Sequence, residues 1–339
     1  MTPGKRYSAI LTFARAVLGI VLLVSVLRSG GAWESLKGLL GFAWLIVLLN
    51  AVPFVGASIE ALRLGVLFGA QGLNVPFRTG FRVVAIGTLF NLWIPGGTGG
   101  DMMKLYYLSQ RHRGRGVEVA TILVVDRAVA LFALLVLIVG LILAQRSIAG
   151  STPTLERATG AVLACLAVLL GLLAAIWSPR IRASRAYQTV ILRWPLGRYF
   201  GRAADAMYAF KSRKRALLLA GVYSLAGHLL LAVTFAIAGT VLVPGVPSLL
   251  VSTLSLLGLV ANALPITPGG VGVGEAAAEA LFRAVGVPGG AALVAAWRVG
   301  MIGVCIAGAG LYIFGDKGTR LSTSAGPLEK SAAPTHPLA

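Results

Sequence analysis

Ionisable residues lie inside long apolar stretches of this sequence, where an isolated charge is costly and requires a partner or a function. Asp126 and Arg127 lie about one third of the way into an apolar run at 118–144, and Arg298 lies deep in another at 287–314. Guanidinium groups bind phosphate through paired hydrogen bonds. Both arginines are therefore candidates to bind an anionic phosphodiester, with carboxylates as counter-charges or as contacts for a cationic headgroup. The alternative is that these charges form structural ion pairs within a helical bundle.

Two further apolar stretches, near 80–110 and 247–283, are interrupted by proline and glycine. The first contains Ile-Pro-Gly-Gly-Thr-Gly-Gly-Asp, ending at Asp101, and the second contains Pro-Gly-Gly-Val-Gly-Val-Gly-Glu, ending at Glu275. Backbone groups freed by such breaks are not satisfied by lipid, so these segments must be buried in protein or face water. The free amides of a half-helix that starts after the glycines can bind an anion. Each acidic residue could instead cap its own half-helix.

Spacing predicts partners for four of the charged residues. Asp101 and Lys104 are three residues apart and could pair on one helical face. Glu60 and Arg63 have the same spacing at the end of an expected span. Both pairs are therefore candidates for local ion pairs.

The second broken stretch carries two carboxylates. Glu275 and Glu279 share a helical face, and Arg298 is the nearest deep cation in the sequence.

Asn91, four residues before Pro95, is expected to bond a backbone carbonyl that the proline frees. The candidate substrate-binding residues are Asn91, Gly99, Gly100, Asp101, Lys104, Asp126, Arg127, Gly269, Gly270, Glu275, Glu279 and Arg298.

Motifs for covalent, nucleotide or metal chemistry are not found. The sequence contains no P-loop, no HExxH and no GxSxG, and the glycines at 270–274 lack the βαβ context of a dinucleotide-binding loop. Cys165 and Cys305 lie in apolar runs without metal-ligand spacing, which favours a packing role. We therefore expect no catalytic residue, no metal and no cofactor, and a protein that is not an enzyme.

Composition indicates an integral membrane protein. Of the 339 residues, 57% are hydrophobic and only 12% are charged, with a mean hydropathy of +0.87, whereas soluble domains carry about 25% charged residues. The net charge of +19 comes from basic residues in the gaps between apolar runs. This pattern favours anionic lipid headgroups as partners and excludes a nucleic-acid motif.

The apolar runs predict an all-α polytopic membrane protein with about six full spans, each near the 20 residues that a bilayer requires. Lys5 and Arg6 precede the first run, which lacks a signal-peptide cleavage site, so we expect it to be a retained helix. The expected spans lie near 8–27, 38–58, 118–144, 158–177, 216–242 and 287–314.

The positive-inside rule predicts the topology, because cytoplasmic loops collect lysine and arginine. Ten basic residues lie from Arg180 to Arg215, and they stay on the same side as the other basic clusters only if both broken stretches are re-entrant hairpins. The prediction is two inverted repeats, as in secondary transporters, with both termini in the cytoplasm of a bacterial-type inner membrane. The parts are a first half at 1–144 with a hairpin near 80–110, a second half at 145–315 with a cytoplasmic loop at 178–215 and a hairpin near 247–283, and a disordered cytoplasmic tail at 316–339.

With these motifs in view, the chain resembles the transmembrane region of lysylphosphatidylglycerol synthases, over about residues 8–315. The resemblance implies movement of a lipid with a charged headgroup between leaflets, best established where the region is fused to an aminoacyl-transferase. The chain ends shortly after its last expected span, so we expect neither that domain nor lysyl transfer. The resemblance carries over to Asn91, Pro95, Gly99, Gly100, Asp101, Lys104 (in place of a more usual arginine), Arg127, Pro268, Gly269, Gly270, Gly272 and Glu275.

The leading hypothesis is a flippase-like transporter of a phospholipid or lipid-phosphate, passive or ion-coupled because no ATP site is present. A second hypothesis is a non-catalytic membrane subunit of a lipid- or glycolipid-modifying pathway, such as hopanoid or aminoacyl-lipid synthesis, with a transferase as partner. A third is a scaffold without a cavity. The sequence leaves homo-oligomerisation open.

Overall fold

The structure is a computed structural model that describes residues 41–91, 99–149, 153–178, 205–261, 266–267 and 270–314, with a few more between 180 and 201. Every regular element of this part is helical. The expected first span at 8–27 and the tail at 316–339 lie outside the described residues.

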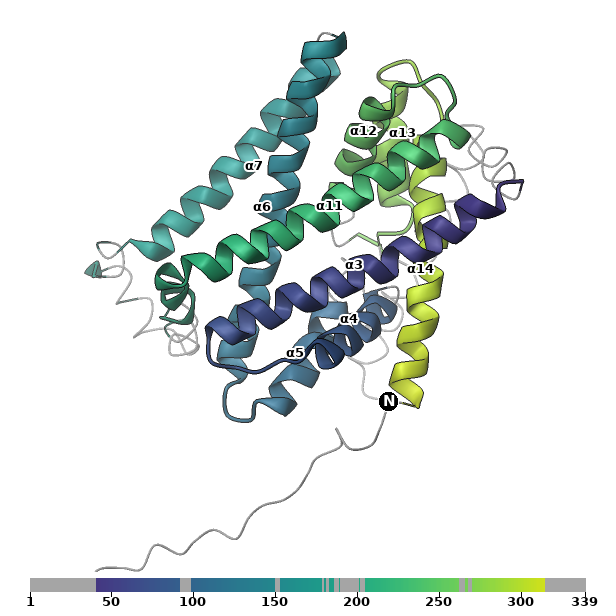
Figure 1. The fold of residues 1–339 in the computed structure, drawn as a ribbon. Helices are drawn as coiled ribbons and strands as arrows, with labels where there is room; N and C mark the ends of the chain where they lie inside the picture. Colours follow the sequence, from purple (N-terminus) through teal and green to yellow (C-terminus); the bar gives the residue numbers. More distant parts are fainter. Residues whose placement is uncertain are drawn as a thin grey trace, which may run out of the picture.

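Five helices are long and apolar enough to cross a membrane, which confirms an all-α polytopic membrane protein (Figure 1). The total number of spans stays a prediction, because the first expected span is not described. The long helices are α3 (Ala43–Ala70), α6 (Gly116–Ala149), α7 (Pro153–Trp177), α11 (Lys214–Leu242) and α14 (Gly290–Ile313). The shorter ones are α4 (Phe77–Asn91), α5 (Gly99–Arg111), α12 (Ser248–Val260), α13 (Val273–Arg283) and the 3₁₀ helix η1 (Phe210–Ser212).

Helix α3 extends well beyond the apolar run that predicted it. The expected span ended at 58, whereas α3 continues to Ala70, with Pro53 inside it. Glu60 and Arg63 are therefore not at the end of a span but inside a helix. The charges ended the apolar run in the sequence, but they do not end the helix, because neighbouring helices supply their counter-charges.

The two broken stretches form pairs of short helices that open at opposite ends of the bundle. The open ends of α4 and α5 meet where Arg111 Nε donates to the Asn74 carbonyl at 3.3 Å. The chain before α12 and the chain after α13 meet at the far end of α11, where Gly289, at the start of α14, packs against Val243. This arrangement is the one that re-entrant hairpins in inverted halves require. The division into two inverted halves itself stays a prediction, because the first expected span is not described.

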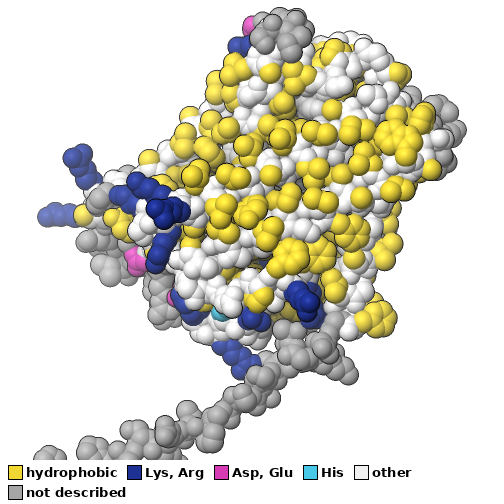
Figure 2. Space-filling model, viewed as in Figure 1, with side chains coloured by type: hydrophobic (Ala, Val, Ile, Leu, Met, Phe, Trp, Pro, Cys, Tyr) yellow, Lys and Arg dark blue, Asp and Glu magenta, His cyan; other side chains and the backbone are white. Residues whose placement is uncertain are grey.

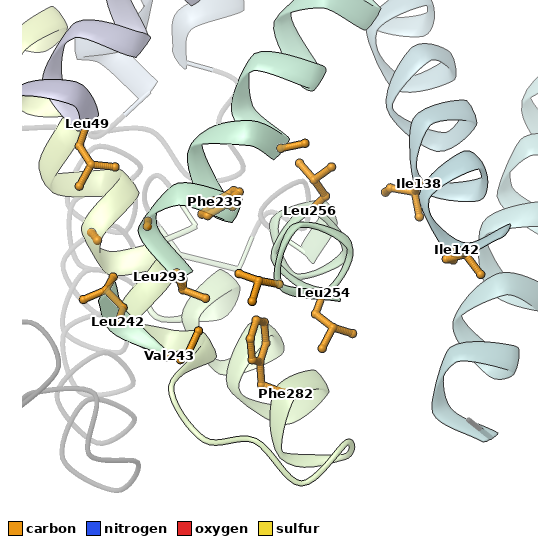
Figure 3. Close-up of a cluster of buried hydrophobic side chains, with 14 of the residues drawn as sticks. Leu49, Ile138, Ile142, Phe235, Leu242, Val243, Leu254, Leu256, Phe282 and Leu293 are labelled. Atoms are coloured by element: carbon orange, nitrogen blue, oxygen red, sulfur yellow. The ribbon is translucent and has the colours of Figure 1, made fainter. Parts of the chain in front are cut away.

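Helix α12 lies in the middle of the larger apolar core, which places the second broken stretch inside protein. Phe235 of α11, Leu254 of α12, Phe282 of α13 and Leu293 of α14 point toward one another (Figure 3). Leu49 of α3 belongs to the same core. This burial allows a broken helix to sit within a membrane protein without exposing its backbone to lipid.

Helix α14 approaches its neighbours through glycine. A Cβ on Gly300 would lie 2.2 Å from the Leu49 carbonyl oxygen of α3, and one on Gly308 would lie 2.2 Å from the Ala85 carbonyl oxygen of α4. Small residues allow such close packing where no hydrophobic effect drives helices together. These contacts fix α14 against both α3 and the first hairpin.

The visible face of the molecule is apolar over most of its area, and lysine and arginine gather toward one end (Figure 2). Hydrogen bonds bring the polar loops of that end together. Arg115 Nη2 donates to the Gln71 carbonyl at 3.3 Å, and Gln71 Nε2 donates to the Ala206 carbonyl at 3.2 Å. Trp177 at the end of α7 also donates to the Met207 carbonyl, at 3.3 Å. The segments that follow α3, α5 and α7 therefore share one end.

Candidate functional site

The start of α5 is held against the end of α4. Asn91 Oδ1 accepts the Gly100 N–H at 2.7 Å. A Cβ on Gly100 would lie 2.7 Å from the Gly87 carbonyl oxygen, so only glycine fits between the two helices. Asn91 thus satisfies a free amide of α5 with its carbonyl oxygen. The expected bond from its amide group to a carbonyl freed by Pro95 stays a prediction, because residues 92–98 lie outside the described part of the chain.

Asp101, the third residue of α5, pairs with Arg127 of α6 (Oδ2 to Nε, 2.5 Å). The side chain of Arg127 is 55% exposed and that of Asp101 is 28% exposed. The other oxygen of Asp101, Oδ1, lies 3.5 Å from Lys104 Nζ, which is the predicted pairing along α5. Lys104 also donates to Glu60 of α3. Four side chains from three helices therefore form a line of alternating charge that ends at the exposed Arg127.

Arg63 and Asp126 form a separate, buried ion pair. Arg63 donates from Nε to Asp126 Oδ1 at 2.6 Å and from Nη2 to Oδ2 at 2.8 Å, and its Nη1 donates to Ser224 Oγ of α11 at 3.1 Å. The predicted pair between Glu60 and Arg63 is therefore wrong. Each of these residues instead finds a partner on another helix, which neutralises a charge that is buried in the bundle.

Glu275, the third residue of α13, pairs with Arg298 of α14 in the second half of the chain. Glu275 is fully buried and Arg298 is 16% exposed. Glu275 Oε2 accepts the Gly272 N–H at 2.9 Å, and Arg298 Nη2 donates to the Gly270 carbonyl at 2.7 Å. The expected capping role of Glu275 and its expected pairing with Arg298 are both present. Gly269 lies outside the described residues.

Glu279 has different partners from Glu275. It accepts from Arg283 Nε at 2.8 Å, and its Oε2 accepts the N–H groups of Gly289 at 3.2 Å and Ala291 at 3.1 Å. These contacts cap the start of α14, where amides lack helical partners. The expectation that Arg298 pairs with both carboxylates is therefore correct for Glu275 and wrong for Glu279, because α14 presents its first turn to Glu279.

The two halves share one local arrangement but differ in exposure. In each, the third residue of the second short helix is acidic and binds an arginine Nε from the long helix that follows. The pair of Asp101 and Arg127 is partly exposed, whereas that of Glu275 and Arg298 is buried. Among the described residues, no group of three or more His, Cys, Asp or Glu side chains could hold a metal ion.

Sequence reasoning did not assign Glu60, Arg63 or Ser224 to the site. Glu60 and Arg63 were visible as charges beside an apolar run, but their spacing indicated a local pair. A count of charge within the ion-paired groups gives a better signal, because the six side chains that pair there (Glu60, Arg63, Asp101, Lys104, Asp126 and Arg127) carry three positive and three negative charges.

Comparisons with known proteins agree with this arrangement at the level of the family. No curated protein and no solved structure matches the chain significantly. The sequence does match the family described as the lysylphosphatidylglycerol synthase TM region, over residues 9–309. That match covers most of the chain and includes both broken stretches with their acid and arginine pairs, so the protein belongs to the family of the lysylphosphatidylglycerol synthase transmembrane region.

Proposed function

We propose that this protein moves a lipid with a charged headgroup between membrane leaflets, and that Arg127 binds the headgroup phosphate. The observation that supports this most is the exposure of Arg127. It lies about 16 Å along α6 from Gly116, at 1.5 Å per residue, and yet its side chain is 55% exposed. A guanidinium at such depth needs a counter-charge, water or a polar ligand, and one as exposed as that of Arg127 is accessible to a ligand. A lipid headgroup bound beside Asp101 and Arg127 would supply such a ligand.

A lipid suits the site better than a soluble solute does. The outer face of the bundle is apolar over most of its visible area, so the acyl chains can stay in the bilayer while the headgroup enters beside Asp101 and Arg127. Arginine binds phosphate in a planar, paired geometry. The proposal includes no covalent step.

The proposed orientation places the basic end of the bundle in the cytoplasm of a bacterial-type cell membrane. Support comes from the loops after α3, α5 and α7, which hydrogen-bond to one another at that end, and from the gathering of lysine and arginine there (Figure 2). Cytoplasmic loops collect such residues. The first hairpin would then enter from the cytoplasm and the second from outside.

The proposal can be tested by leaflet exchange. Purified protein is placed in phosphatidylcholine vesicles that contain a trace of headgroup-labelled phosphatidylglycerol or phosphatidylethanolamine, and the label that becomes accessible outside is followed with time. We expect fast exchange by the native chain and at least about a tenfold loss in Arg127→Gln, because a charge-assisted hydrogen bond contributes about 1.5–3 kcal/mol.

Arg113→Gln is the matched control, because Arg113 is an exposed arginine in the loop after α5. We expect its exchange to match that of the native chain. If native protein and empty vesicles exchange both lipids equally, phospholipid transport is wrong. If Arg127→Gln and Arg113→Gln behave alike while both stay folded, Arg127 is not the headgroup site.

A further inference from the structure

We infer that the Glu60–Lys104 ion pair controls how readily Arg127 exchanges its internal partner, Asp101, for a lipid phosphate. This inference rests on the proposed function and adds residues that act on the site from behind it. Neither Glu60 nor Lys104 needs to contact the lipid. Both act through the carboxylate of Asp101, so they are positioning residues.

Asp101 occupies the place that a phosphate would take. Its Oδ2 lies 2.5 Å from Arg127 Nε. An incoming phosphate that binds the Nε side of this guanidinium must therefore displace the carboxylate, and a carboxylate displaced within a membrane requires another cation.

Lys104 is the cation in position to receive it. Its Nζ lies 3.5 Å from Asp101 Oδ1, so a small rotation of the carboxylate would shorten this contact while it releases Arg127. The Lys104 side chain is only 7% exposed, which keeps the contact out of bulk water and strengthens it. Asp101 therefore has a close partner in Arg127 and a longer contact to Lys104, which can shorten when a ligand binds Arg127.

Glu60 sets the strength of that second contact. It accepts from the same Lys104 ammonium on the side of α3. While Glu60 is charged, it neutralises Lys104 and weakens the attraction of Lys104 for Asp101. Loss of the Glu60 charge would draw Asp101 toward Lys104 and would leave Arg127 more available to an anion.

The described residues of the second half show no equivalent of Lys104 beside the acid. Ala278 occupies the position three residues after Glu275 that Lys104 occupies after Asp101. Glu275 is also fully buried and bonded to the backbone N–H of Gly272. The described residues therefore provide an exchange partner for the acid in the first half only.

The test measures binding of a fluorescent phosphatidylglycerol to native protein and to charge variants in zwitterionic detergent micelles. Removal or restoration of one nearby charge changes anion affinity about fivefold or more in a protein interior. We expect tighter binding in Glu60→Gln and weaker binding in Lys104→Met. In the double variant we expect the weak binding of Lys104→Met, because Glu60 acts only through the Lys104 ammonium and Asp101 then has no second cation.

Two further variants keep the result interpretable. Lys104→Arg retains the charge and should bind the lipid much as the native chain does. Glu118→Gln removes an exposed carboxylate near the start of α6 and should also leave the affinity unchanged. Thermal unfolding identifies any variant that fails to fold. If Lys104→Met fails to fold, the double variant Glu60→Gln with Lys104→Arg is used in its place. We expect this double variant to bind the lipid more tightly than the native chain, because it keeps the cation at position 104 and loses the Glu60 charge.

The outcomes separate the two ideas. If Arg127→Gln abolishes binding while Glu60→Gln and Lys104→Met both bind like the native chain, the inference is wrong and the proposed function stands. The inference also fails if these two variants shift the affinity in the same direction. If the native chain binds no phosphatidylglycerol and Arg127→Gln changes nothing, the proposed headgroup site fails as well.

Discussion

The buried ion pair between Arg63 and Asp126 allows a sharp test of how this bundle tolerates charge. The two side chains are 10% and 4% exposed and share hydrogen bonds of 2.6 and 2.8 Å between α3 and α6. Asp126→Asn keeps the shape of the side chain but leaves the guanidinium of Arg63 without its counter-charge. Loss of one partner from a buried pair costs about 3–5 kcal/mol, so we expect the free energy of unfolding to fall by that amount.

The assay is unfolding in mixed micelles as the fraction of denaturing detergent increases, followed by circular dichroism or tryptophan fluorescence. Glu118→Gln is the matched control, because Glu118 lies 3.9 Å from Arg115 in a pair whose side chains are 36% and 42% exposed. Exposed pairs contribute about 0–1 kcal/mol. The two variants should therefore differ by at least about 2 kcal/mol.

A double variant identifies the cause of the loss. Arg63→Met with Asp126→Leu removes both charges and keeps apolar volume, and such replacements are often neutral or stabilising. We expect it to recover most of the stability that Asp126→Asn loses. If Asp126→Asn is no worse than Glu118→Gln, the pair does not stabilise the bundle. If the double variant is as unstable as the single one, lost packing and not an unpaired charge explains the effect.

Three other changes have defined outcomes. Gly308→Val should lower the free energy of unfolding by about 1–3 kcal/mol in the same assay. Gly310→Ala is the control and should change it little, because nothing lies within 4 Å of a new Cβ at that site. Equal effects of the two variants would contradict close packing of α14. Glu279→Ala should lower the free energy of unfolding by about 1–2 kcal/mol, because two amides at the start of α14 lose their acceptor. A change near zero would contradict the capping role of Glu279. Burial, and then the neighbouring Arg111 and Arg115, lower the pKa of His112 in the loop after α5. The unfolded chain then binds this proton more readily, so stability should fall as pH drops below about 6.5, and His112→Gln should reduce that fall in melting curves from pH 5 to pH 8.

Length and hydropathy were enough to predict the long helices from the sequence. The expected span at 216–242 corresponds to α11, and that at 287–314 corresponds to α14, each to within a few residues. Their apolar residues must avoid water, and a helix is the regular structure that satisfies its own backbone in lipid. The same reasoning predicted an end at 58 for the span that corresponds to α3, although the helix continues to Ala70. Hydropathy counts each charged residue as unfavourable in the membrane, whether or not another helix supplies a counter-charge.

Partners across helices were the part of the site that the sequence did not reveal. Local pairings at a spacing of three were predicted for both Glu60–Arg63 and Asp101–Lys104, and only the second is present. The sequence gives the spacing of two residues along one helix, and this spacing predicts whether their side chains can meet. The counter-charge of Arg63 lies 63 residues away on α6, and that contact depends on how the helices pack.

The distribution of charge explains why an incoming ligand should act at Arg127 and not elsewhere in the first half. Arg63 and Asp126 neutralise one another through two hydrogen bonds, so an anion gains nothing there. Four further charges of the site alternate in sign from Glu60 through Lys104 and Asp101 to Arg127. The interior members of this line have a counter-charge on each side, and the acidic end is held by a buried lysine. The guanidinium at the other end is the most exposed member of the line. We therefore propose that a new negative charge is accommodated best at that end, where displacement of the Asp101 carboxylate toward Lys104 makes room for it.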